Sequence, residues 1–213
     1  MKNLMFLFPT LSFLAIAKAQ DAPVNGVTVP EPSIISRGLD ERIWQTVTAA
    51  NRGGKTILQT NTYRELGTGI CHADQNGNIV DSQELITITP NGYGLANQGQ
   101  HSALFPPSIT GIVDYLDGQG HRFQTRILGL AYLDYASGKS VMFFETKDSI
   151  GQIDPATPNI ITYRDAFTDG VKASVRFTYK KSAFSQDILV TAKLPTPTEV
   201  SKKLDKADTT IQK

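Results

Sequence analysis

The chain has little cysteine, little net charge and no long hydrophobic segment after its first residues. Its 213 residues include one cysteine, Cys71. A framework of internal disulfides is therefore excluded, and stability must come from a hydrophobic core. The formal net charge is +1. Such a nearly neutral chain has no long-range field to attract nucleic acid or anionic lipid, so neither partner is expected.

Several sequence motifs that carry chemistry are also missing. There is no Gly-x-Ser-x-Gly elbow, P-loop or dinucleotide fingerprint, and no Asn-x-Ser/Thr acceptor for glycosylation. The three histidines, His72, His101 and His121, lack zinc-binding spacing. Residues 74–78 superficially resemble a calcium loop, but Asn76-Gly77 favours a tight hairpin turn. No metal and no cofactor are therefore predicted.

The first residues predict export. Lys2 precedes an apolar run from Leu4 to Ile16, and small residues follow at positions 17 and 19. This pattern is typical of a secretory signal at residues 1–19. A membrane anchor is the alternative, but the run is short and contains a proline. We expect a secreted or cell-surface protein with no membrane span in the mature chain, and export without disulfides favours a bacterial source.

The remaining sequence predicts an extended leader at 20–38, a folded domain at 39–200 and a polar tail at 201–213. The leader is rich in proline and has little periodicity. The tail ends in what looks like the start of a further strand, so the chain is interpreted as the front of something longer. A frayed polar terminus is the alternative.

Residues 39–200 predict an all-β fold. About ten short segments rich in β-branched and aromatic residues are separated by turn signals such as Pro90-Asn91-Gly92. This spacing predicts an antiparallel β-sandwich or open barrel. Residues 39–50 fit either a helix or a strand, and we favour a strand. From Val171 to Tyr179 apolar and polar residues alternate, so one face of this strand should lie in the core.

Several phrases resemble a known group of proteins. They include TYRELGTGI, VDSQELITITPNG, NQGQHSALFP and TRILGLAYLDYASGKSVMF. In this order they resemble the amino-terminal module of large exported proteins from Verrucomicrobia and related planctomycete-group bacteria, often followed by RHS-type or other surface repeats. The resemblance covers roughly residues 39–200. It implies export, a β-rich architecture and a chain that continues further, and it supplies no catalytic residues.

Few side chains suggest catalysis. Cys71 and His72 are adjacent, so on a strand they point to opposite faces, and we interpret Cys71 as buried and inert. Asp114, Asp117 and Asp134 offer carboxylates for glycoside hydrolysis. Acidic residues beside turns are common, however, and no catalytic residue is predicted.

Aromatic side chains offer a surface for sugar stacking. Tyr93 follows a turn in a glycine-rich loop, and it is a candidate ligand-binding residue together with Tyr115. Most of the others should lie in the core or at the edge of the sandwich. The candidate aromatic set for such a surface is Trp44, Tyr63, Tyr93, Tyr115, Tyr132, Tyr135 and Tyr163.

Three functions are compatible with these patterns. The favoured one is a non-enzymatic structural or adhesive module of an exported bacterial surface protein. Its expected partner is a cell-surface polymer or the rest of a longer polypeptide. The alternatives are a carbohydrate-binding β-sandwich and a carboxylate-dependent hydrolase. A carbohydrate-binding sandwich requires a flat row of exposed aromatic side chains. A hydrolase requires two carboxylates that face each other.

Overall fold

The computed structural model describes residues 28–136, 138 and 140–200. The predicted signal at 1–19 and the predicted tail at 201–213 lie outside the described residues, as do leader residues 20–27. The prediction of an all-β fold is confirmed, with open antiparallel sheets and no closed barrel among the described residues. These residues form sixteen strands, more than the ten expected, because several have only two to four residues.

The described residues fall into two compact units, residues 28–33 with 45–62 and residues 34–44 with 63–200. A long hairpin provides most of the first unit. Its strands are β2 (Glu41–Arg52) and β3 (Lys55–Leu66), and β1 (Ser33–Arg37) precedes β2 in a three-stranded sheet. Gly53 and Gly54 both have positive φ, which a two-residue hairpin turn requires. The strand predicted within 39–50 is therefore confirmed.

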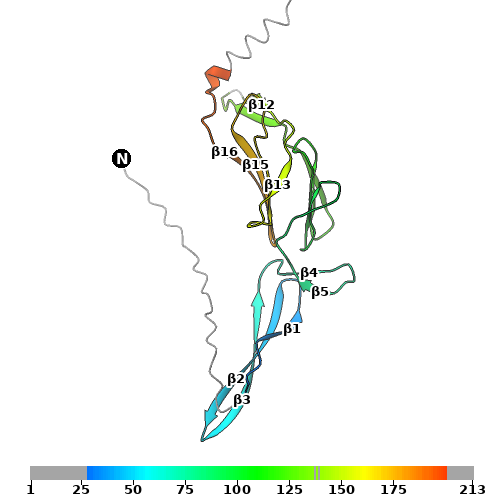
Figure 1. Cartoon of the computed structure of the whole chain (residues 1–213), viewed down its shortest axis with the longest axis vertical. Coiled ribbons are helices and arrows are strands. Elements are labelled where there is room, and N and C mark those ends of the chain that lie inside the picture. Colours follow the sequence, from blue (N-terminus) through cyan, green and yellow to red (C-terminus); the bar gives the residue numbers. More distant parts are fainter. Residues whose placement is uncertain (1–27, 137, 139, 201–213) are drawn as a thin grey trace, which may run out of the picture. The chain divides into compact units, whose positions relative to one another are not determined.

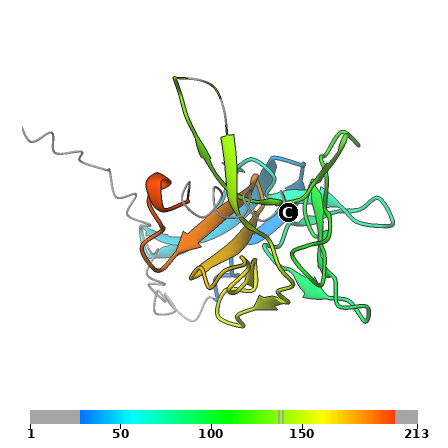
Figure 2. The ribbon, with the colours of Figure 1, turned by 90° about the horizontal axis from the view of Figure 1, so that it is seen from above.

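The second unit contains two sheets that face each other, as the green and the orange strands of Figure 2 show. One sheet has the order β10 (Arg122–Thr125), β9 (Val113–Leu116), β8 (Ser102–Phe105), β7 (Gly94–Ala96) and β6 (Thr87–Ile88). The other has the order β13 (Gly151–Ile153), β14 (Ile160–Tyr163), β15 (Ala173–Lys180) and β16 (Ala183–Val190). Figure 1 labels several of these strands.

Two smaller hairpins complete the second unit. They are β4 (Cys71–Ala73) with β5 (Ile79–Asp81), and β11 (Gly129–Leu133) with β12 (Ser140–Glu145). The turn predicted at residues 74–78 is confirmed, because Gly77 has φ of 82° and the backbone N–H of Asp74 donates to the carbonyl of Asn78. Asn76 does not have the positive φ expected of it, since five residues connect the two strands.

The core lies between the two large sheets. Val175, Phe177 and Tyr179 on β15 are fully buried, so the dry face predicted for this strand is confirmed. They pack against residues of the five-stranded sheet, where Phe105 contacts Phe177 with ring centroids 5.5 Å apart. The apolar faces of both sheets thus meet, as they do in a sandwich.

Two buried tyrosine hydroxyls join the sheets. Tyr179 donates to the carbonyl of His101 at 2.7 Å, and Tyr163 donates to the carbonyl of Pro106 at 2.6 Å. His101 directly precedes β8 and Pro106 directly follows it. The two hydrogen bonds therefore fix both ends of β8 over the opposite sheet, and they satisfy hydroxyls that would be costly to bury unpaired.

Backbone hydrogen bonds between the two sheets lie along one side of the sandwich. Backbone hydrogen bonds join the sheets beside β6 and β13, from Ile86 to Pro158 and from Gly151 to Pro107. On the opposite side, β10 and β16 are the outermost strands, and no described strand pairs with their outer edges. Phe123 on β10 is 61% exposed there.

The buried tyrosines predict a loss of stability in alkali. Burial raises the pKa of both phenols, that of Tyr179 to about 12. Below about pH 10 both phenols are neutral in the folded and unfolded states, so their contribution is intact. As the pH rises further, the unfolded chain ionises first, and each tyrosine should cost about 1.4 kcal/mol of unfolding free energy per pH unit. Urea unfolding at increasing pH measures this slope.

Tyr179→Phe should reduce that slope and also lower stability at neutral pH by about 1–3 kcal/mol, because the His101 carbonyl loses its buried donor. Tyr135→Phe is the matched control, since Tyr135 is 92% exposed. Equal alkaline slopes in Tyr179→Phe and the unaltered chain would contradict the assignment.

Candidate functional site

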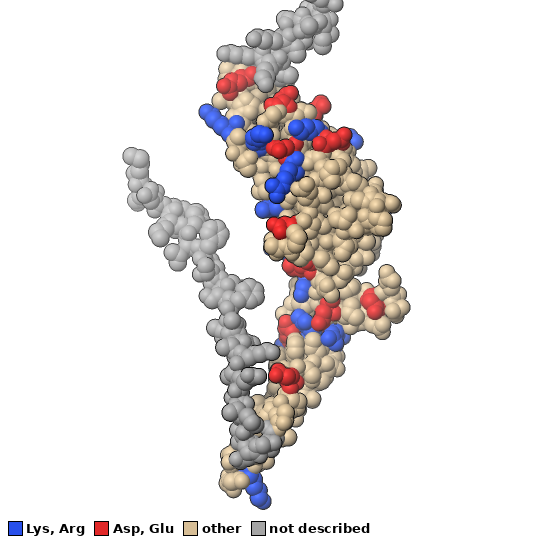
Figure 3. Space-filling view, viewed as in Figure 1, with Lys and Arg blue, Asp and Glu red and all other residues tan. Residues whose placement is uncertain are grey.

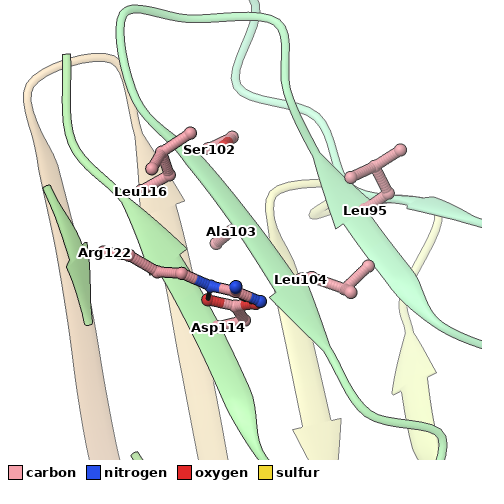
Figure 4. A pocket seen from close by; sticks show the side chains of 7 residues that line it. All are labelled: Leu95, Ser102, Ala103, Leu104, Asp114, Leu116 and Arg122. Carbon is pink, nitrogen blue, oxygen red and sulfur yellow. Dashed lines mark hydrogen bonds and ion pairs between the residues drawn. The ribbon is translucent and has the colours of Figure 1, made fainter. Parts of the chain in front are cut away.

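A groove of about 320 Å³ lies on the outer face of the five-stranded sheet (Figure 4). Side chains alternate across each strand, so the residues between the buried ones face outward. Leu95 pairs with Leu104, which pairs with Asp114, and this places the two leucines and the acid in one row across three strands. The groove is lined by Leu95, Ser102, Ala103, Leu104, Asp114, Leu116 and Arg122.

One ion pair lies in this groove. The Nε of Arg122 donates to both carboxylate oxygens of Asp114, at 2.8 and 3.0 Å, and its Nη2 also contacts Oδ2. Figure 4 shows the two side chains meeting beside Leu104. The hydrogen bond from Arg122 holds the pKa of Asp114 below its usual value. Asp114 therefore stays ionised, and the groove combines apolar walls with one fixed charge pair.

The three acids considered for hydrolysis have separate partners. Asp117 accepts from the backbone N–H groups of Gln119 and His121 and from the His121 ring, all at 2.8 to 2.9 Å. Asp134 accepts from the backbone N–H of Ala136 at 3.0 Å. Together with the Asp114–Arg122 pair, these contacts stabilise turns and a strand edge. No described hydrogen bond joins any two of these acids.

Cys71 is buried, as predicted, and no hydrogen bond found among the described residues joins its thiol to a histidine. It lies at the start of β4, and its Sγ is 3.6 Å from Oδ1 of Asp81. Burial, followed by the charge of Asp81, raises the pKa of the thiol. His72 instead contacts the hydroxyl of Ser82, while His101 packs between the rings of Tyr115 and Tyr179. A buried thiol with a raised pKa is a poor nucleophile.

A network of ion pairs surrounds Cys71. Oδ1 of Asp81 is 3.0 Å from Arg37 and 3.5 Å from Arg42. Arg42 also pairs with Glu65 at 3.1 Å, and Glu65 accepts from the indole N–H of Trp44 at 2.8 Å. The hydrogen bond from Arg37 lowers the pKa of Asp81. The network ties β1, β2, β3 and β5 together, and no motif or spacing in the sequence predicts it.

Two of the candidate aromatics, the partly buried Trp44 and the exposed Tyr63, form a stacked pair. The rings of Trp44 and Tyr63 have centroids 6.1 Å apart and planes within 4°. Tyr63 is 49% exposed, and the Arg42 guanidinium lies 6.0 Å from the Trp44 ring. The stacked pair therefore presents apolar surface at Tyr63, beside the Glu65 carboxylate and the Arg42 guanidinium.

The predicted ligand-binding residues, Tyr93 and Tyr115, lie in different places. Tyr93 follows β6 in a turn and is 37% exposed. Tyr115 is half-buried on β9, where it contacts Phe123 and Phe184 beside the open side of the sandwich. No described ring contact joins Tyr93 to Tyr115.

The other tyrosines of the aromatic set are dispersed. Tyr163 is in the core, and Tyr135 is exposed. Tyr132 stacks on Phe143 and donates to the carbonyl of Pro195. The seven aromatics therefore do not share one surface.

Searches of the described residues find no group of three or more His, Cys, Asp or Glu side chains placed to hold a metal ion. Within the same residues, no helix has the length and apolar character that a membrane crossing needs. Comparison with models of protein families, with curated proteins and with solved structures finds no match to the chain.

The environment of Cys71 predicts low reactivity in the folded protein. Labelling by a thiol reagent should be at least about 100-fold slower than in urea, because the thiol must first be exposed by opening of the structure. The matched control is Cys71→Ala with Asn76→Cys, which moves the thiol to an exposed turn residue. This control should label rapidly. Rapid labelling of native Cys71 would show that the thiol is accessible and reactive.

Proposed function

We propose that the chain is a non-enzymatic structural or adhesive module of an exported bacterial surface protein. The observation that carries this proposal is the leucine-lined groove. The solvent face of an antiparallel sheet is ordinarily polar, yet here Leu95, Leu104 and Leu116 face outward together. An exposed apolar surface rimmed by a polar pair is typical of a binding surface.

The lowered pKa values of the carboxylates favour a non-enzymatic binding module over a hydrolase. A glycoside hydrolase needs a carboxyl group that stays protonated near neutral pH, and hence a raised pKa. Asp114, the acid in the groove, has a lowered pKa because Arg122 binds it. Hydrogen bonds also lower the pKa values of Asp40, Asp74, Asp81 and Asp117. The carboxylate-dependent hydrolase consequently has less support.

Export rests on the sequence. It is supported by the predicted signal at residues 1–19 and by the resemblance to modules of large exported proteins. Charged side chains of both signs are interspersed on the face drawn in Figure 3, with a broad uncharged area among them. This distribution suits contact with a cell-surface polymer or with the rest of a longer polypeptide more than attraction of nucleic acid.

The second candidate is carbohydrate binding, which the Trp44–Tyr63 pair favours. The two rings are parallel and stacked, and the exposed part of Tyr63 offers an apolar surface on which a sugar ring can stack. Arg42 and Glu65 lie beside the pair, and their polar atoms suit hydroxyl groups.

Retention of protein-coated beads on isolated bacterial envelopes tests the proposal. We expect beads carrying the full chain to be retained, and Leu104→Asp to abolish at least about nine-tenths of that retention, because a charge in the groove opposes apolar contact. Val141→Asp is the matched control, since Val141 is an exposed apolar residue on β12. It should leave retention unchanged.

Other outcomes of the bead experiment would contradict the proposal. Retention that survives Leu104→Asp but is lost in Trp44→Ala, and that soluble polysaccharide competes away, would support sugar binding instead. Release of sugar from the envelopes would identify a hydrolase. Beads that are never retained would exclude adhesion to this surface.

A further inference from the structure

The outer edge of β16 has unpaired backbone groups. β16 pairs with β15 through eight residues without a register shift. The N–H of Tyr179 donates toward β14, to Asn159, and the N–H of Thr191 donates to Lys172. Hydrogen-bonded and non-bonded pairs alternate along an antiparallel ladder. The outward N–H and C=O groups therefore belong to Phe184, Gln186, Ile188 and Val190, and no described strand pairs with them.

This edge lacks the features that usually protect a strand from pairing. Such features are a short strand, a bulge, a proline, or a lysine on the edge. β16 has the sequence AFSQDILV and contains none of them. Its one charged residue, Asp187, is neutralised by Arg176 at 3.0 Å. The edge is thus a regular and nearly uncharged template for another strand.

Apolar side chains lie next to this edge. Phe123 is exposed on β10, its ring is 6.3 Å from Tyr115, and Tyr115 is 5.4 Å from Phe184 on β16. These aromatics line the open side of the sandwich, between its two outermost strands. A strand added to β16 would cover them, so pairing would bury apolar surface as well as satisfy backbone groups.

We propose that the occupant is a second copy of this chain, whose β16 adds antiparallel to the first across a two-fold axis. Two identical antiparallel edges match in hydrogen-bonding pattern, and such a contact closes at a dimer. The chain carries a formal charge of only +1, so two copies do not repel strongly. The inference goes beyond the proposed function, since this pairing is compatible with an adhesive or a sugar-binding module.

Sedimentation of the full chain over a range of concentrations tests this pairing. We expect a reversible equilibrium between monomer and dimer. Gln186→Pro should weaken dimerisation at least about 30-fold, because it removes an outward N–H and leaves the ladder to β15 intact. Gln186→Ala is the matched control and should dimerise like the unaltered chain. Gln186→Lys, which adds a positive charge to the pairing edge of each copy, should also weaken dimerisation, less so at high salt.

Three results would overturn the inference. A monomer at every concentration would mean that a second copy does not cover the edge, and that another polypeptide or nothing at all does. Assemblies that keep growing beyond the dimer would exclude two-fold closure. Dimerisation unaffected in both Gln186→Pro and Gln186→Lys would place the interface elsewhere. Bead retention depends on Leu104 and dimerisation on Gln186, so either proposal can fail alone.

Discussion

The sandwich depends on two buried hydroxyl groups that cross its core. Tyr163 and Tyr179 belong to one sheet and donate to carbonyls at the two ends of β8 in the other. Their rings contribute apolar burial, and their hydroxyls fix the relative register of the sheets, which packing alone specifies less sharply. The chain makes room for this arrangement at Gly99, where a Cβ atom would collide with the Tyr179 hydroxyl. The two hydrogen bonds therefore fix the position of one sheet relative to the other.

The arrangement of the two sheets determines which surfaces stay exposed. Backbone hydrogen bonds close the side beside β6 and β13, whereas the side beside β10 and β16 stays open. The outer face of the five-stranded sheet carries the leucine-lined groove. Meanwhile the acids that could have served a reaction are bound by nearby basic or backbone groups, as Asp114 is by Arg122 and Asp81 by Arg37. These charged groups thus stabilise the fold, and the proposed contact surfaces are the groove and the edge of β16.

Local patterns in the sequence predicted local structure well. The alternation from Val171 to Tyr179 identified a strand with one buried face, and Asn76-Gly77 identified a turn. Long-range partners were not predictable, because nothing in the spacing of Arg37, Asp81 and Glu65 shows that they meet.

One local pattern in the sequence indicates a helix that was not predicted. Thr196 and Glu199 form a capping box at the start of helical residues 197–200, with the backbone N–H of Thr196 donating to Glu199 at 2.7 Å. Trp44 and Tyr63 were both candidates for a sugar-stacking surface, but nothing in the sequence predicts that their rings stack on each other.

The central claim is that a second strand pairs with the outer edge of β16. Amide hydrogen exchange along β16 tests it most directly, when measured at low and at high protein concentration. The N–H groups of Ser185 and Asp187 point toward β15, so the account predicts slow exchange for them at both concentrations. The N–H groups of Gln186 and Ile188 point outward, and they should exchange rapidly at low concentration and slowly at high concentration. Exchange at Gln186 and Ile188 that is the same at both concentrations would contradict the account.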